Sequence, residues 1–206
     1  FHNAGFHVVG IDSSISVIDS LKRGVSPITE ETGMKIPDSQ RWEVTSDFGN
    51  SIQYCDLAIV CVPTPVDDKL QPDVKAVRSA IDSIIKSINK DARTVIILES
   101  TVQPGTTRSC ITDSITNFPC SEEKILMAYC PERVSPGEGG YGVEDVARVI
   151  GSEDPELTRI LSKLYCKITS GDVIAVSSME VAEASKLVEN AQRDIDIAFA
   201  NELAIL

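Results

Sequence analysis

The chain has 206 residues, 42% of them hydrophobic and 24% charged, which is the balance of a globular protein with one sizeable core. Its formal net charge of −12 argues against nucleic-acid binding, because a nucleic-acid-binding surface needs basic residues that neutralise phosphates. No apolar run approaches the ~18 residues of a membrane span and no signal segment opens the chain, so we expect a cytoplasmic protein that does not contact a membrane.

Runs of β-branched and other apolar residues recur along the chain and predict strands. The second, third and fourth of these runs are continuously apolar, which is typical of strands buried on both faces. The expected strands are 7–11, 57–62, 94–98, 125–129, 148–150 and 173–176.

Stretches with helical periodicity alternate with these strands. In the second of them, apolar residues recur at helical spacing from Val74 to Ile88, and Asp73 is a candidate cap. Strand–helix alternation predicts an α/β protein with a Rossmann-like, doubly wound parallel sheet. We place this domain at residues 1–176 and the start of a long helix that leaves it at 177–206. The expected helices are 15–23, 73–89, 106–116, 154–165 and 179–206.

The beginning of the chain lacks a motif that the fold calls for. A dinucleotide-binding domain opens with a strand, a glycine-rich turn and a helix, whereas this chain opens with what resembles a helix end stopped by Gly5. The strand that follows ends at Asp12, where an acidic residue of the second strand binds the ribose hydroxyls and repels the 2′-phosphate of NADP. We therefore expect a domain whose first strand and glycine-rich loop are missing. The alternative, that Asp12 only caps the next helix, stays open.

Three segments follow buried strands at the edge where a doubly wound sheet places its ligands. They are rich in proline and hydroxyl or charged side chains, and therefore differ from simple turns. These segments are 62–65, 99–105 and 129–137.

The long helix carries a fourth group of polar residues. Lys186, Asn190 and Arg193 lie at i, i+4 and i+7 and therefore share one face. A lysine, an amide and an arginine on one face could grip a diphosphate or a sugar. Taken by itself, such a face is more simply a solvated one.

The six cysteines give no indication of a metal site. None forms a CxxC pair, and no Cys/His spacing matches a zinc site, so we predict no metal. Cys61 lies in an apolar run and is interpreted as a small buried hydrophobe.

Taken together, these segments resemble the UDP-glucose/GDP-mannose dehydrogenase family over nearly the whole chain. Each segment is weak alone, but their order is specific, and it outweighs the interpretation of the helix face as merely solvated. Residues 4–12 are similar to that family's second strand, Val62-Pro63-Thr64-Pro65 to its adenosine-side loop, Glu99-Ser100-Thr101 with Pro104-Gly105 to its nicotinamide-side loop, and 183–203 to the start of the helix that joins its two domains.

One segment also indicates a branch of the family. UDP-glucose dehydrogenases typically carry Pro-Glu-Phe-Leu after the fourth strand, whereas this chain has Cys130-Pro131-Glu132-Arg133 followed by Val134-Ser135-Pro136-Gly137. This segment resembles the branch that oxidises UDP-N-acetylmannosamine or UDP-N-acetylglucosamine, which implies a role in polysaccharide biosynthesis.

The resemblance implies NAD as the cofactor and a UDP-sugar as the substrate. Family members oxidise the C6 alcohol to a carboxylate in two hydride transfers, through a cysteine thioester that water hydrolyses. The cofactor-binding residues that the resemblance implies are Asp12, Val62, Pro63, Thr64, Ser100 and Thr101.

The resemblance also implies roles for the residues around the sugar. Thr101 and Glu132 would lie near the reacting carbon and a water, with Glu132 as base or as the group that positions the water. Lys186 would stabilise developing oxyanion charge, and Asn190 would fix the hydroxyl or oxyanion. The substrate-binding residues that it implies are Arg133, Val134, Lys186, Asn190 and Arg193.

This chain departs from the family's pattern at its end. The family's nucleophilic cysteine lies in a glycine-rich segment well beyond the long helix, and none of the six cysteines here lies in such a segment. We therefore expect the isolated chain to be inactive, and detectable NAD-dependent turnover would refute this. The apolar stripe of the helix needs a partner surface, so we expect a homodimer through it.

Three alternatives stay open. The chain could belong to a UDP-glucose 6-dehydrogenase, or to a different β-hydroxyacid dehydrogenase such as the 6-phosphogluconate type. It could also be a non-catalytic binding module that keeps the fold without the chemistry.

Overall fold

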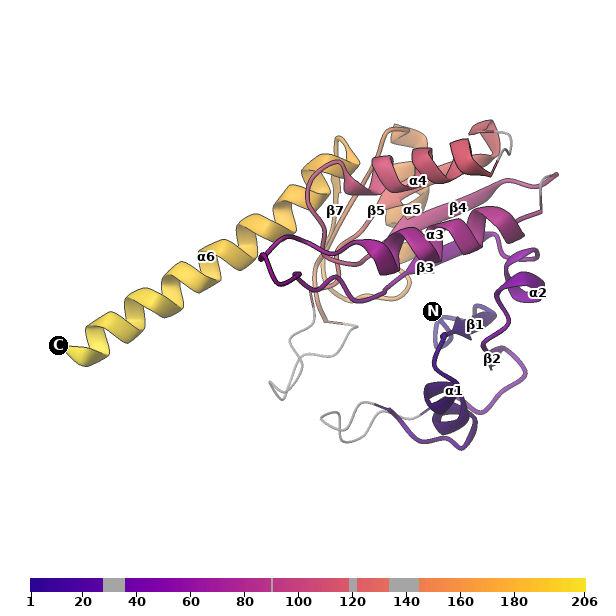
Figure 1. Ribbon diagram of the computed structural model, residues 1–206, viewed down its shortest axis with the longest axis horizontal. Coiled ribbons are helices and arrows are strands. Elements are labelled where there is room, and N and C mark those ends of the chain that lie inside the picture. The colour runs from indigo at the N-terminus through magenta and orange to yellow at the C-terminus, as the bar shows by residue number, and fades with distance from the viewer. Residues whose placement is uncertain (28–35, 90, 119–121, 134–144) are drawn as a thin grey trace.

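The computed structural model describes residues 1–27, 36–89, 91–118, 122–133 and 145–206. Five strands form the main sheet, in the spatial order β3-β4-β5-β6-β7 (Figure 1). All neighbouring pairs are parallel except β5 and β6, which are antiparallel. The strands are β3 (Leu57–Val60), β4 (Thr94–Leu98), β5 (Ile125–Tyr129), β6 (Arg148–Ser152) and β7 (Val173–Val176).

The antiparallel pair is the one departure from the expected parallel sheet. Parallel neighbours need a crossover connection, usually a helix, whereas antiparallel neighbours do not. The sequence between β5 and β6 is rich in glycine and carries no helical periodicity, which fits the antiparallel pairing. The fold class, an α/β protein with a mainly parallel Rossmann-like sheet, is confirmed.

Helices cover both faces of this sheet, as Figure 1 shows. β4 illustrates how one strand serves two cores, because successive side chains point to opposite faces. Ile96 and Leu98 are buried in a cluster with residues of α3 and α4, whereas Ile97 is buried in a second cluster with residues of α5. These helices are α3 (Lys75–Ser87), α4 (Thr106–Asn117) and α5 (Pro155–Tyr165).

The start of α3 differs in detail from the prediction. Val74, not Asp73, is the N-cap residue, and it makes no side-chain cap hydrogen bond. Asp73 still accepts a hydrogen bond from the backbone N–H of Lys75 at 2.9 Å, so its carboxylate satisfies a first-turn donor from one position earlier.

A second, two-stranded parallel sheet lies apart from the main one (Figure 1). The expected strand at 7–11 is β1, whereas β2 and α2 were not predicted from the sequence. Runs of four or five residues with mixed polarity give too short a pattern to detect. These elements are β1 (Val8–Ile11), α1 (Ile15–Lys22), β2 (Trp42–Thr45) and α2 (Phe48–Ile52), and a single 3₁₀ turn, η1 (Glu122–Lys124), precedes β5.

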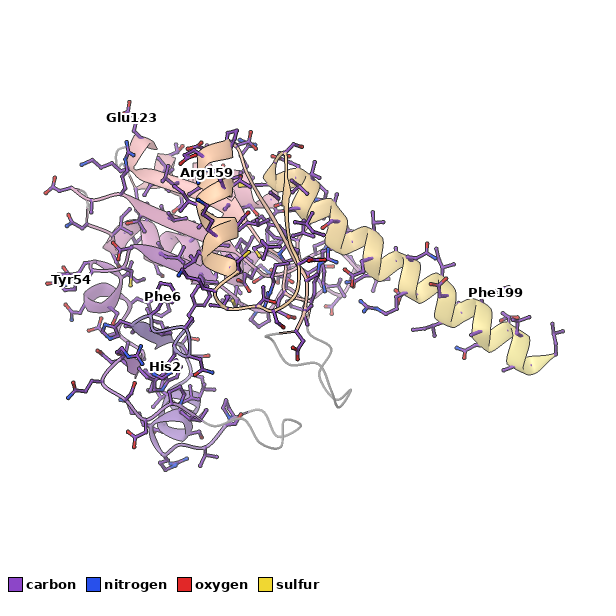
Figure 2. The ribbon with its side chains drawn as sticks, turned by 180° about the vertical axis from the view of Figure 1, so that it is seen from behind. His2, Phe6, Tyr54, Glu123, Arg159 and Phe199 are labelled. Carbon is purple, nitrogen blue, oxygen red and sulfur yellow. The ribbon has the colours of Figure 1, made fainter. Side chains whose placement is uncertain are left out.

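The last helix, α6 (Met179–Ile205), begins against the main sheet and then projects away from it (Figure 1). Met179, Ala182 and Glu183 are buried, whereas every residue from 191 onward is exposed. Figure 2 shows Phe199 on this projecting part, clear of the domain. Within the described residues, no helix combines the length and the apolar character that crossing a bilayer requires.

Candidate functional site

Two of the predicted cofactor-binding loops are joined directly to each other by hydrogen bonds. The Ser100 hydroxyl donates to the carbonyl of Val62 at 2.7 Å, and the Thr64 hydroxyl donates to the carbonyl of Thr101 at 2.7 Å. Each hydroxyl keeps acceptor lone pairs for a ligand. The loops after β3 and β4 therefore form one surface at the carboxyl ends of these strands, while Pro63 stands exposed between them.

The loop after β5 joins the same surface. The hydroxyl of the fully buried Tyr129 donates to the carbonyl of Ser100 at 3.1 Å, and the backbone N–H of Glu132 donates to the carbonyl of Glu99 at 3.4 Å. The half-buried Glu132 therefore lies on the same surface as the loop after β4, beside the segment that begins at Glu99.

A buried polar cluster of Glu99, Tyr165 and Arg148 lies at the base of these loops. The Tyr165 hydroxyl donates to Glu99 Oε1 at 2.5 Å, and the Arg148 guanidinium lies 3.6 Å from Glu99 Oε2. Burial raises the pKa of Glu99 above its usual value, although Tyr165 and Arg148 oppose this rise. Sequence reasoning missed this cluster, and the one available signal was a carboxylate at the end of a continuous apolar strand.

The cysteines in this region do not behave as nucleophiles. Cys130 is fully buried, and burial raises the pKa of its thiol to about 12, so the thiol is protonated at neutral pH. Cys61 is exposed, because β3 ends at Val60, so the prediction that it is buried was wrong. Among the described residues, no group of three His, Cys, Asp or Glu side chains is placed to hold a metal ion.

The first turns of α6 contact the loop after β5 through Arg133. Arg133 donates to the Ser185 hydroxyl at 3.1 Å and forms an ion pair with Glu189. The negative charges of Glu189 and Glu132 act on Lys186 and favour its protonated form. The Arg133 Nε is buried and has no hydrogen-bond partner among the described residues, so it is available to a ligand oxygen.

Lys186 differs from the other cations of the site, because within the described part of the chain its ammonium has neither a hydrogen bond nor an ion pair. Burial is the main cause that lowers the pKa of Lys186, and the positive charges of Arg133 and Arg193 lower it further, while Glu189 and Glu132 oppose this. A half-buried lysine with no structural partner among the described residues can offer its ammonium to an anionic group of a ligand.

The two remaining residues of the predicted helix face contact each other. Arg193 donates to the Asn190 side-chain oxygen at 2.5 Å, and the arginine is exposed where α6 leaves the domain. Val134, the last residue expected to contact substrate, lies outside the described residues.

Asp12 lies apart from all of these groups, at the end of β1 in the two-stranded sheet. Its Oδ1 accepts the Ser14 N–H at 2.7 Å, and Ser14, not Asp12, is the N-cap of α1. The capping alternative for Asp12 was therefore wrong. Its Oδ2 accepts no hydrogen bond from the described residues, which leaves one carboxylate oxygen for a ribose hydroxyl and fits a dinucleotide.

Comparisons with known proteins agree with this arrangement. A family profile described as the UDP-glucose/GDP-mannose dehydrogenase family, NAD binding domain, matches residues 1–169. The UDP-N-acetyl-D-glucosamine 6-dehydrogenase of Pseudomonas aeruginosa is 34% identical over 201 residues, which are 97% of this chain and 47% of that protein. The structure of a UDP-D-ManNAc dehydrogenase from Pyrococcus horikoshii matches with a TM-score of 0.88 and 29% identity, over 99% of this chain and 49% of that one.

The chain spans about half the length of the curated relatives that it matches. A 3-hydroxyisobutyrate dehydrogenase from Mycobacterium tuberculosis matches with a TM-score of 0.66 and 20% identity, over 98% of this chain and 58% of that one. This likeness to a different kind of hydroxyacid dehydrogenase shows a shared fold alone.

Proposed function

The chain belongs to the UDP-glucose/GDP-mannose dehydrogenase family, whose NAD-binding domain it contains, and we propose that it is the cofactor-binding half of a UDP-N-acetylhexosamine 6-dehydrogenase. The whole enzyme oxidises the C6 alcohol of its UDP-sugar to the uronate in two hydride transfers. The observation that carries this proposal is the half-buried Lys186, which has no ion pair or hydrogen bond of its ammonium among the described residues and on which the charge of Glu132 acts.

The cofactor residues of the proposal belong to both sheets. Bound NAD would supply the hydride acceptor for the oxidation at the sugar C6. Asp12 holds the adenosine ribose through its free carboxylate oxygen, which disfavours the 2′-phosphate of NADP. The loops that Ser100 joins to Val62 and Thr64 joins to Thr101 contact the rest of the dinucleotide, with Pro63 exposed toward it.

A strand pairing supports the same proposal. Among the described strands, β1 pairs only with β2, and β3 pairs only with β4, so each of these strands has an edge without a described partner. In this proposal, these two edges are where the first strand of a dinucleotide-binding domain, followed by its glycine-rich phosphate-binding turn, would pair, and this pairing would bring Asp12 beside the loops of the main sheet.

The chemistry rests on four residues. Lys186 stabilises the negative charge that develops on the sugar oxygen, and Asn190 orients the hydroxyl or oxyanion. Glu132 accepts a proton or positions the hydrolytic water, and Thr101 lies next to the reacting carbon.

The proposed substrate-binding residues come from the loop after β5 and from α6. The buried Nε of Arg133 donates to an oxygen of the nucleotide sugar, while the Nη atoms stay on Ser185 and Glu189. Arg193 provides donors for the anionic part of the substrate, for which a guanidinium fork is suited. Val134 contributes its backbone.

We infer the oligomeric state from the exposed half of α6. Its large apolar side chains are left uncovered, which favours a homodimer through this helix. In this proposal the NAD-binding domain covers residues 1–176, the dimerisation helix starts at 177, and the enzyme acts in the cytoplasm in polysaccharide biosynthesis. The uncovered apolar residues include Val188, Ile195, Phe199, Leu203 and Ile205.

The test compares substrates on the full-length protein. We expect kcat/KM for UDP-N-acetylmannosamine or UDP-N-acetylglucosamine to exceed that for UDP-glucose by at least about tenfold, the factor that an added polar contact of about 1.4 kcal/mol gives. A preference for UDP-glucose would move the protein to the other branch. NAD binding without turnover of any UDP-sugar would indicate a non-catalytic binding module.

A further inference from the structure

Glu183 is a fully buried carboxylate that the chemistry described above does not use. It lies in the second turn of α6 and accepts hydrogen bonds from the Gly105 N–H at 2.5 Å, the Thr107 N–H at 2.9 Å and the Thr107 hydroxyl at 2.6 Å. A buried carboxylate is costly unless it is hydrogen-bonded, and charge-assisted hydrogen bonds of this kind are the strong ones.

The three donors belong to the first turn of α4. Gly105 is the N-cap of that helix, with φ 90°, and α4 has no side-chain cap of its own. The free N–H groups and the positive end of the helix dipole favour a negative charge at this position. Glu183 provides that charge from a distant helix, so the N-terminus of α4 is already filled and does not bind the cofactor diphosphate.

The contact joins two parts of the proposed site. On one side, α4 follows directly after the loop that carries Ser100 and Thr101. On the other side, Lys186 and Asn190 lie three and seven residues after Glu183, on the same face of α6. The contact of Glu183 with α4 therefore helps to fix the rotation of α6, and with it the position of Lys186 and Asn190 relative to the loop.

We propose that Glu183 is a positioning residue of the dehydrogenase site, which holds Lys186 and Asn190 in register with Thr101. This inference rests on the proposed function. It does not extend to the neighbouring ion pair of Arg108 with Glu180, which lies closer to the surface and joins the same two helices.

The test uses Glu183→Gln in the full-length protein. The amide keeps the shape of the side chain but offers one acceptor oxygen where two are used, so α6 shifts against the loop. We expect kcat to fall about 10- to 100-fold, the cost of a displacement on the order of 1 Å, while KM for NAD changes less than about twofold. Glu180→Gln, one turn earlier on α6, is the matched control and should leave both values unchanged.

Two further variants separate positioning from stability. Ile111→Val on α4 removes one buried methylene group without touching Glu183, and it should lower the unfolding midpoint while kcat stays unchanged. Thr107→Val removes only one of the three donors and covers the case in which Glu183→Gln fails to fold. It should lower kcat by a few-fold, with KM for NAD unchanged.

Amide hydrogen exchange gives a readout that needs no turnover. Gly105 and Thr107 should exchange at least about tenfold faster in Glu183→Gln and at the native rate in Glu180→Gln. An active wild type whose kcat is unchanged in Glu183→Gln would overturn the positioning role. An inactive wild type with the expected exchange pattern would instead refute the proposed function and leave the α4–α6 contact established.

Discussion

The two sheets hold their site residues in different ways. After β3, β4 and β5 of the main sheet, the loops are joined to one another through Thr64, Ser100 and Tyr129, and Glu183 and Arg133 join them to α6. In the two-stranded sheet, Asp12 is held by one backbone N–H. The difference shows that hydrogen bonds within this chain arrange the residues proposed for the sugar chemistry, whereas the position of Asp12, the carboxylate proposed to bind the ribose, depends on where the small sheet lies. Each variant below should affect one sheet and spare the other.

The largest expected effect is on the rate and comes from Lys186. In the full-length enzyme, Lys186→Met should lower kcat about 10²- to 10³-fold, the usual loss for removing one preorganised charge-stabilising donor. The unfolding midpoint at pH 7 should stay the same or rise, because burial makes the unpaired ammonium unfavourable in the folded state. Steady-state kinetics and thermal unfolding measure these two effects.

A matched control for this variant is Lys75→Met, because the Lys75 side chain is 89% exposed at the start of α3 and its surface ion pair with Asp73 contributes little. It should change neither kcat nor the unfolding midpoint. A Lys186→Met enzyme that unfolds well below the wild type would contradict the account, since it would make Lys186 a structural residue.

The pH dependence of the rate follows from the same lysine. Its pKa is lowered from 10.5 in the folded protein, and the protonated form is the one that stabilises an oxyanion. As the pH rises through the folded-state pKa, kcat should therefore fall by about tenfold per pH unit, starting below pH 10.5. Lys186→Arg should move this alkaline limb upward, because a guanidinium stays charged. If the alkaline limb does not move in Lys186→Arg, the limb reports the titration of another group.

The buried cluster of Glu99, Tyr165 and Arg148 should contribute to the stability of the fold. Tyr165→Phe removes the hydrogen bond to Glu99 and should lower the free energy of unfolding by about 1–3 kcal/mol. Tyr54→Phe, at a tyrosine that is 83% exposed, should change it by less than about 0.5 kcal/mol. Denaturant unfolding measures both, and equal effects would contradict the role of the buried cluster.

The sign of the pH effect sharpens this test. Burial raises the pKa of Glu99 in the folded state. The contribution of the protonated Glu99 to the free energy of unfolding is therefore full at low pH, and it is lost as the pH rises through that pKa. Tyr165 hydrogen-bonds the ionised form and limits this loss. The penalty of Tyr165→Phe should therefore be larger at pH 7 than at pH 4.

The smallest effect on kcat is expected from the two-stranded sheet. Asp12→Ala should weaken NAD binding by about 1–3 kcal/mol, the range for losing a hydrogen bond to a charged group, and narrow the preference over NADP. Since none of the hydrogen bonds between described side chains and loops joins Asp12 to the main sheet, kcat at saturating NAD should stay close to the wild-type value. Calorimetric titration measures the affinity, and an unchanged value would remove Asp12 from the cofactor site.

The main sheet could be predicted from the sequence because its strands are continuous apolar runs. The predicted bounds of β4 and β5 agree with the structure to the residue, and those of β3 are two residues too long, since Cys61 and Val62 already belong to the loop. The direction of β6 could not be predicted, because a strand's own sequence does not encode which neighbour it joins or in which sense. β2 and α2 were too short for a periodic pattern.

The proposed site was predictable where residues leave a strand end, and not where contacts join distant elements. Lys186 and Glu132 could be named from motifs, whereas Glu183 and Tyr165 act through partners more than 60 residues away. One signal for Glu183 was present in the sequence. It shares a helical stripe with Met179 and Ala182, so an acidic residue occupies a position that the helix buries.

The most direct test of the central claim is the amount of NADH that the full-length protein forms from a limiting amount of UDP-N-acetylmannosamine. The account predicts about two NADH for each sugar consumed, with the uronate as the product, because the same site performs both oxidations. One NADH for each sugar with an aldehyde product, or no NADH from any UDP-N-acetylhexosamine, would contradict it.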